Sequence, residues 1–185
     1  KIVEAEFEGK ILYPVRGRSC SSSAMPGLKD KFPTFKSFAI APLDKIYEGE
    51  KLATSKKLSA NTLESGILIN VSKPGSLKFE FRPLPRIAQI SPVFGMAFTF
   101  VDGDQFPELY LVQNFFGPQR ETGRMNGGVS ILLKNDGGRF RPVWPSESHL
   151  VVSGDATALT VADMNNDGRP DFHVAVNGDR ALAFE

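Results

Sequence analysis

The chain has 185 residues, 41% of them hydrophobic and 23% charged, which is the composition of a globular protein with a sizeable core. Lys plus Arg (22) nearly cancel Asp plus Glu (21), so the net charge of +1 offers no basic footprint for nucleic acid and no polybasic patch for a membrane surface. The single cysteine excludes an intrachain disulfide framework, and no apolar run approaches the roughly 20 residues of a transmembrane helix.

Residues 1–57 are predicted to combine a pair of strands with a helical insertion. Apolar residues alternate from Ile2 to Val15 around a central glycine, a pattern that predicts two strands joined by a turn. A polar loop is expected over residues 16–23. Residues 25–47 carry prolines that can open short helices and a candidate cap at Thr34, so this segment is predicted to be helical.

Residues 58–185 are predicted to form a series of short β-strands. Fifteen Phe, 17 Gly and 13 Pro favour short strands bounded by turns over long helices. Several of these strands are apolar almost throughout, as strands buried on both faces are. The six clearest segments are Gly66–Asn70, Met96–Phe100, Leu109–Gln113, Val129–Leu133, Ala158–Ala162 and Phe172–Val176.

These strands are related by an internal repeat. The segment 94–114 aligns without a gap on 157–177, an offset of 63 residues. A second match relates Ile67–Asn70 to Ile131–Asn135. Repeats of several strands and roughly 40–65 residues are typical of propeller blades or stacked β arrays.

The sequence therefore predicts an all-β fold, a partial β-propeller of two to three blades of antiparallel strands with a short helical insertion near residues 25–47. Residues 1–57 would supply the first blade strands and the insertion, and residues 58–185 the repeat blades. Because a propeller closes with about 4–8 blades, we expect this chain to be a fragment whose remaining blades lie in the same full-length protein.

One loop of the second repeat has the spacing of a metal site. Asp163, Asn165, Asp167 and Asp171 stand at positions 1, 3, 5 and 9 of the loop, and the carbonyl of Arg169 at position 7 can complete the shell. Oxygen ligands of this kind suit Ca²⁺ better than a transition metal. An EF-hand is excluded because its position 12 needs an acidic residue and here holds a valine. A simple turn without metal stays open as the alternative.

The first repeat carries a weaker copy of the same loop. Asp102, Asp104 and Glu108 align with ligands of the second repeat, whereas Phe100 replaces the first Asp and Gln105 replaces the turn glycine. Loss of one carboxylate and of the glycine should weaken cation binding. The alternative for this segment is a surface turn with three acidic side chains.

Nothing in the sequence assembles a catalytic site. Cys20 follows an Arg-Gly-Arg-Ser run that could activate a thiolate, but the chain offers only His149 and His173 as bases. The first lies in a polar loop and the second in a predicted strand. We expect a structural cysteine and a protein that is not an enzyme.

The loop 115–128 is longer than a tight hairpin requires. Its Phe115 and Phe116, beside Arg120 and Arg124, could stack on a sugar or a peptide. A loop tucked in by its own aromatic side chains is the equal alternative.

In the two repeats that carry the acidic loops, the sequence resembles the FG-GAP/VCBS repeat family, whose cation-loop hairpins recur in the propeller of integrin α subunits. Phe94-Gly95 followed by the acidic loop fits one copy of the family pattern, and Thr157-Ala158 departs from Phe-Gly in the second copy. The resemblance covers residues 60–185. The segment around Cys20 and the Phe-rich residues 32–38 also look like large bacterial secreted members.

The resemblance implies a calcium-binding propeller segment outside the cytoplasm: extracellular, at the cell surface or periplasmic. It further implies an interaction or adhesion module with a protein or glycan ligand. The alternative is the propeller portion of a secreted hydrolase, lyase or dehydrogenase whose catalytic residues lie outside this segment.

Overall fold

The computed structural model describes residues 2–47, 50–119 and 122–185. The chain divides into two compact units, Lys1–Asn61 and Thr62–Glu185. Among the described helices the longest, α1 (Arg18–Ala24), has seven residues, so none is long and apolar enough to cross a bilayer.

The first unit opens with an antiparallel hairpin. Strand β1 (Ala5–Glu8) pairs with β2 (Ile11–Pro14), and Glu8 lies opposite Ile11. The two-residue turn between them begins at Gly9, whose φ of 64° lies in the left-handed region that glycine adopts without strain. The strand pair predicted around this glycine is confirmed.

Five short helices follow the hairpin. They are α1 and then α2 (Leu28–Lys31), α3 (Phe35–Ala39), α4 (Leu43–Ile46) and α5 (Glu50–Ala53). Thr34 caps α3 in a capping box with Ser37, as its side chain accepts from the Ser37 amide at 3.0 Å. A small apolar core of Leu28, Phe32, Phe38, Ala41 and Ile46 holds the unit together.

The polar loop predicted over residues 16–23 is wrong, because α1 begins at Arg18. Because serine is a weak helix former, the run of serines in this segment predicts a loop and not a helix. Ser21 and Ser22 are buried, however, and Ser21 accepts a hydrogen bond from the Tyr47 hydroxyl at 3.0 Å. Tertiary contacts have overridden the local preference.

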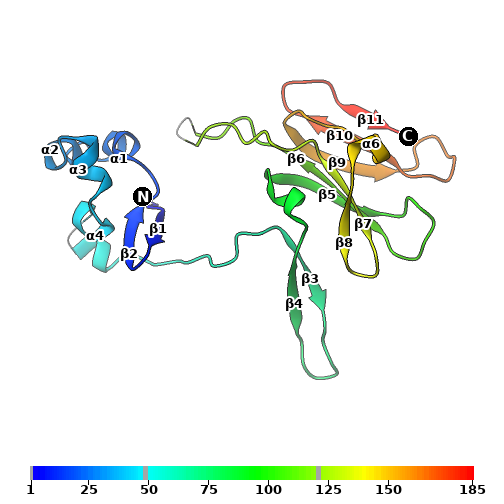
Figure 1. The fold of residues 1–185 in the computed structure, drawn as a ribbon, viewed down its shortest axis with the longest axis horizontal. Helices are drawn as coiled ribbons and strands as arrows, with labels where there is room; N and C mark the ends of the chain where they lie inside the picture. The colour runs from blue at the N-terminus through cyan, green and yellow to red at the C-terminus, as the bar shows by residue number, and fades with distance from the viewer. Residues whose placement is uncertain (1, 48–49, 120–121) are drawn as a thin grey trace. The chain divides into compact units, whose positions relative to one another are not determined.

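The second unit consists of three antiparallel sheets (Figure 1). Strands β3 (Gly66–Asn70) and β4 (Phe79–Pro83) form a hairpin. A four-stranded sheet has the order β5 (Val93–Thr99), β6 (Glu108–Gln113), β7 (Ile131–Asn135) and β8 (Phe140–Val143). A three-stranded sheet is built from β9 (Ala156–Ala162), β10 (Asp171–Val176) and β11 (Leu182–Phe184).

Two short helical turns, η1 (Arg86–Gln89) and α6 (Pro145–Ser148), precede β5 and β9 respectively. The predicted all-β class is confirmed.

The repeat of 63 residues holds in the structure residue by residue. Strands β5 and β6 carried forward by 63 positions give the bounds of β9 and β10. Their pairing also coincides: Thr99 lies opposite Glu108 and Ala162 opposite Asp171, and both hairpins have a bulge at the far end. The two acidic loops, one between β5 and β6 and the other between β9 and β10, therefore connect equivalent strand ends.

Strand β5 packs against β9, and a glycine permits the close approach. A Cβ atom on Gly95 would lie 2.8 Å from Cγ2 of Val112 and 2.9 Å from the backbone nitrogen of Leu159. Ala158, at the same position of the next repeat, is exposed. A side chain is therefore excluded at Gly95 and tolerated at position 158, which agrees with Phe-Gly in the first repeat and Thr-Ala in the second.

The larger of two apolar cores lies between the four-stranded and three-stranded sheets, and a second one of Leu84, Ala88, Leu109, Leu111, Ile131 and Leu133 packs on the other side chains of β6 and β7. Tyr110 on β6 and Phe172 on β10 meet edge to face, with ring centroids 5.2 Å apart. Around them pack Val112, Leu132, Leu150, Val152, Ala156 and Val174. Every residue of β6 is buried, as the continuous apolar pattern predicts for a central strand.

Asn114 ties the end of β6 to the segment that enters β9. Its side-chain amide donates to the carbonyls of Gly128 at 2.8 Å, Ser153 at 3.1 Å and Gly154 at 3.0 Å, and its oxygen accepts from the Gly128 amide at 2.9 Å. Asn114 is fully buried and holds a φ of 93°, a conformation that costs free energy outside glycine. These contacts offset that cost.

Candidate functional site

The two candidate loops share a common backbone framework. In the first, the Asp104 amide donates to Asp102 Oδ1 at 3.1 Å and the Phe106 amide donates to Asp104 Oδ1 at 2.6 Å. The second has the same pair 63 residues later, since Asp167 donates to Asn165 Oδ1 at 2.9 Å and Arg169 donates to Asp167 Oδ1 at 2.8 Å. Side chains at positions 3 and 5 thus shape both loops by bonding the amide two residues on.

The second loop has an additional anchor at position 1. The carboxylate of Asp163 accepts from the Asp167 amide at 3.1 Å and from the Gly168 amide at 2.9 Å. Gly168 has a φ of 83°, which favours glycine at the turn. Phe100 and Gln105 stand at these two positions of the first loop, so this anchor is lacking there.

The last carboxylate of the second loop is Asp171, and it is 3% exposed. Its Oδ2 accepts from the Met164 amide at 2.8 Å, whereas its Oδ1 is buried with no hydrogen-bond partner in the described structure. A buried carboxylate oxygen left unpaired is costly. The donor set of three carboxylates, one amide and a backbone carbonyl fits a hard cation that would satisfy this oxygen.

The structure brings the carboxylates of the first loop closest together. Ligand atoms of Asp102, Asp104 and Glu108 all lie within 4.8 Å of one another, and no other group of three acidic, His or Cys side chains in the described parts of the chain does so. The carboxylates of Asp163, Asp167 and Asp171 are therefore farther apart. Asp163 is turned toward backbone amides, as described above.

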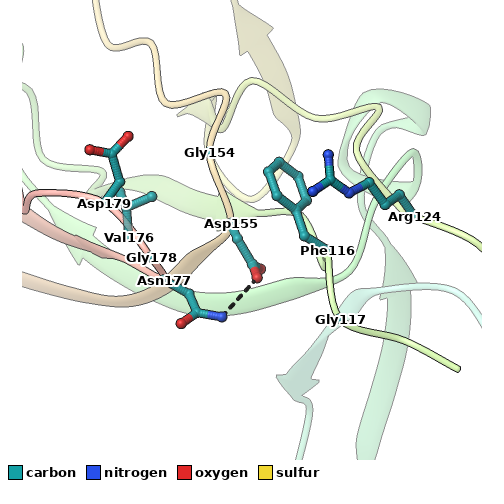
Figure 2. Close-up of a pocket in the computed structure, with 9 residues that line it drawn as sticks. All are labelled: Phe116, Gly117, Arg124, Gly154, Asp155, Val176, Asn177, Gly178 and Asp179. Carbon is teal, nitrogen blue, oxygen red and sulfur yellow. Dashed lines mark hydrogen bonds between the residues drawn. The ribbon is translucent and has the colours of Figure 1, made fainter.

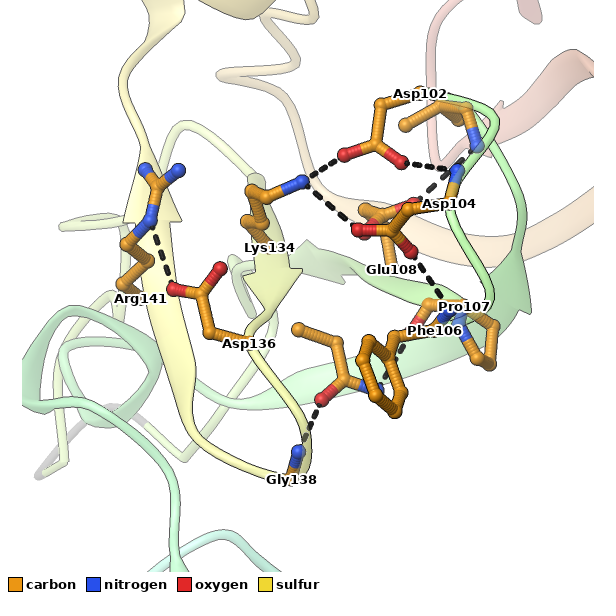
Figure 3. A network of polar contacts seen from close by, with 11 residues as sticks. Asp102, Asp104, Phe106, Pro107, Glu108, Lys134, Asp136, Gly138 and Arg141 are labelled. Carbon is orange, nitrogen blue, oxygen red and sulfur yellow. Dashed lines mark hydrogen bonds and ion pairs between the residues drawn. The ribbon is translucent and has the colours of Figure 1, made fainter.

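Lys134, on β7, fills the first loop (Figure 3). Its ammonium contacts Asp102 Oδ2 and donates to Asp104 Oδ2 at 3.3 Å. The sequence pattern gave no sign of this residue, because it stands 26 positions after Glu108 on another strand. Pairing of β7 with β6 brings it there; Leu133 lies opposite Leu109, and Lys134 is the next residue along β7.

A second candidate region is a pocket of about 450 Å³ at the opposite end of the strands from the loops (Figure 2). Phe116 and Arg124 line it together with Asp155, Asn177 and Asp179. The Asn177 amide donates to Asp155 Oδ2 at 3.2 Å, and Asp155 Oδ1 is buried without a partner in the described structure. Sequence analysis had singled out Phe116 and Arg124 but none of the three polar residues.

The described residues of the loop 115–128 are held by contacts with one another and with β5. Phe115 packs on Phe94 with ring centroids 5.5 Å apart, and the Arg124 guanidinium lies 4.6 Å from the centre of the Phe116 ring. Phe115 and Met125 form an isolated antiparallel bridge. Arg120 lies outside the described residues. Arg124 thus covers one face of the Phe116 ring.

Cys20 lies within α1 and is half-buried. Nη1 of Arg16 lies 3.8 Å from its sulfur. His149 ends α6 in a left-handed conformation with a φ of 56°, and His173 sits in β10 opposite Thr160 and Ala183. Both histidines thus have structural positions at the end of a helix and within a sheet.

Comparison with known families places residues 101–174 in the FG-GAP-like repeat. The matched segment begins inside the first loop and ends in β10, beyond the second loop, so the resemblance read from the acidic motifs is confirmed there. No curated protein and no solved structure matches the chain. A repeat of this type indicates a β-propeller-like module, which agrees with the antiparallel sheets and their 63-residue period.

Proposed function

We propose that this chain is a calcium-stabilised propeller segment that acts as a non-enzymatic, extracellular interaction or adhesion module. The single observation that carries the calcium part is the buried, unpartnered Oδ1 of Asp171 at the base of a loop with hard-oxygen spacing. Bound calcium would supply positive charge at this loop. Asp163, Asn165, Asp167, Asp171 and the carbonyl of Arg169 are the groups that would hold it.

The residues of the loop are prepared for this role by the fold. Position 9 is fixed at the first residue of β10, where Asp171 pairs with Ala162. Positions 3 and 5 are oriented by hydrogen bonds to the amides of Asp167 and Arg169. Each of these carboxyl or amide oxygens retains a lone pair for a cation.

We expect calcium to stabilise the folded chain and to have no catalytic role. Three carboxylates within one nine-residue loop repel one another, so part of the binding free energy becomes folding free energy. The cation would hold the turn between β9 and β10 and thereby the sheet that packs on the core through Phe172. The extracellular location belongs to the same proposal and is supported by the FG-GAP-like repeat, because such repeats are typically extracellular or secreted.

The test is thermal unfolding of the chain with calcium and with a chelator. Calcium should raise Tm by about 5–11 °C, the shift expected when a ligand at 100 times its Kd stabilises a chain of this size. Asp167→Ala should abolish the rise, and Asp30→Ala, an acidic residue of α2, is the matched control that should preserve it. A melting curve of the unaltered chain that does not respond to chelator contradicts the calcium proposal.

The interaction part needs a separate test. Arrays of glycans and peptides probed with the calcium-loaded chain should show selective binding that weakens in chelator and in Asp167→Ala. If calcium stabilises the chain but no glycan or peptide binds, the cation has a purely structural role and the adhesion role is contradicted.

A further inference from the structure

We propose that the two loops are filled by different cations: the ammonium of Lys134 is the resident cation of the first loop, and a dissolved divalent ion is that of the second. The first loop then needs no metal. The contrast rests on the proposed function of the second loop, whereas the assignment of Lys134 stands on the first loop alone.

In the first loop two of the three carboxylates are already paired with an ammonium. The Lys134 ammonium reaches both Asp102 and Asp104, whose carboxylates lie with that of Glu108 within 4.8 Å of one another. Figure 3 shows the lysine side chain directed at these groups from the neighbouring strand. Its side chain is 24% exposed and those of Asp102 and Asp104 are 34% and 39% exposed, so the pairs are partly shielded from water.

The position of the lysine is set by the fold. Leu133 and Asn135, on either side of it, are buried, and the Asn135 side chain donates to the carbonyl of Pro107 at 3.1 Å. This hydrogen bond joins the end of β7 to the end of the loop itself. The ammonium is therefore delivered to the carboxylates by a paired and anchored strand, not by a free surface side chain.

The first loop has also lost what a divalent ion needs. Phe100 removes the carboxylate of position 1, and Gln105 removes the turn glycine. Glu108 keeps the framework contact, accepting from the Val101 amide at 3.3 Å, and its Oε1 is buried without a partner in the described structure. The Lys134 ammonium pairs with Asp102 and Asp104 and forms no hydrogen bond with this Glu108 oxygen. It offsets the charge of Glu108 only through its proximity to the cluster.

The second loop lacks such a lysine. In the register of the sheets Leu133 corresponds to Phe184, because these residues lie opposite Leu109 and Phe172. Lys134 therefore corresponds to Glu185, a residue of the opposite charge. Within the described residues no Lys, Arg or His nitrogen forms an ion pair with Asp163, Asp167 or Asp171. A cation for that loop has to come from solution.

The test is calorimetric titration of the whole chain with CaCl2, combined with thermal unfolding in chelator. The unaltered chain should bind one ion. Lys134→Gln, which removes the charge and keeps the length, should bind a second and weaker ion, and Lys134→Gln with Asp104→Asn should return to one. In chelator, Lys134→Gln should melt about 2–4 °C lower, as loss of a partly shielded ion-pair cluster predicts. Lys134→Arg and Lys78→Gln, a change at an exposed lysine, are the controls that should match the unaltered chain.

Each outcome decides one of the two claims. Two ions in the unaltered chain, or no additional ion and no loss of Tm in Lys134→Gln, would overturn the assignment of Lys134. No ion in the unaltered chain but one in Lys134→Gln would overturn the calcium proposal for the second loop and support the assignment of Lys134 to the first.

Discussion

Glu108 and Asp171 stand 63 positions apart in the chain and make the same contact. Each accepts a hydrogen bond from the amide seven residues before it, Val101 at 3.3 Å and Met164 at 2.8 Å. Each also buries a second carboxylate oxygen that has no hydrogen-bond partner in the described structure. Such a pair of unsatisfied oxygens at equivalent positions indicates a shared requirement of the repeat for positive charge inside the loop.

Asp171→Asn should change the stability in opposite directions with and without calcium. In chelator the substitution removes a buried charge that only the Met164 amide compensates, so Tm should rise by about 2–4 °C. With calcium the variant lacks a ligand and should melt below the unaltered chain. Melting curves in both conditions check this crossover.

Glu108→Gln is the matched control for that prediction. It makes the same change at the equivalent position of the first loop, where Lys134 is near. It should shift the melting curve by the same amount in calcium and in chelator. If Asp171→Asn also shifts Tm by the same amount in calcium and in chelator, Asp171 has a purely structural role and does not bind calcium.

Asn114→Ala should destabilise the second unit strongly. The substitution removes four hydrogen bonds, two with Gly128 before β7 and two with the segment before β9, and it places alanine at a φ of 93°. We expect a loss of about 3 kcal/mol in the free energy of unfolding, measured in urea. Asn177→Ala, at the equivalent and exposed position with one such bond, should cost less than about 1 kcal/mol. Equal losses in the free energy of unfolding for the two variants would contradict a special structural role of the Asn114 hydrogen bonds.

Gly95→Ala should cost more than substitutions at other strand positions. The added Cβ meets the backbone of Leu159 at 2.9 Å, and a backbone atom cannot swing away as the end of a side chain can. We expect about 2–3 kcal/mol from overpacking, measured by chemical unfolding. Ala158→Gly is the control at the equivalent position; with open space there it should cost about 1 kcal/mol or less. A neutral Gly95→Ala would show that β5 and β9 do not approach so closely.

Tyr110 should make the stability depend on alkaline pH. Burial raises the pKa of this fully buried phenol to about 12 from an ordinary value of 10.0, and Ser130 opposes part of the shift. Because the unfolded chain ionises first, stability is complete below pH 10 and falls as the pH rises from 10 to 12. A shift of two units corresponds to about 3 kcal/mol.

Tyr110→Phe isolates this contribution. The difference in urea midpoint between the unaltered chain and the variant should change between pH 9 and pH 12, in favour of the variant. At neutral pH the two should differ by about 1 kcal/mol or less, since the contact of the buried hydroxyl with Ser130 falls short of hydrogen-bond geometry. A constant difference across the range would mean that the phenol is accessible to water.

Much of the second unit followed from the sequence because its signals are local. Apolar runs such as Leu109–Gln113 can only be central strands, and the 63-residue offset fixed the loops to equivalent strand ends. The serines of α1 were misread for the opposite reason: their helix depends on burial and on Tyr47, 26 residues away.

The candidate site was only partly predictable for the same reason. The spacing of Asp163 to Asp171 lies in one loop and can be read directly. Lys134 reaches the first loop through strand pairing, which no spacing within the loop encodes. The buried oxygens of Glu108 and Asp171 likewise appear only once the strands have packed.

The most direct test of the central claim is a calcium titration of three chains by calorimetry: unaltered, Asp167→Ala and Asp104→Ala. The last two change equivalent residues of the two loops. The account predicts one bound ion in the unaltered chain, none in Asp167→Ala and one in Asp104→Ala. An ion that is lost in Asp104→Ala and kept in Asp167→Ala, or no ion in the unaltered chain, would contradict it.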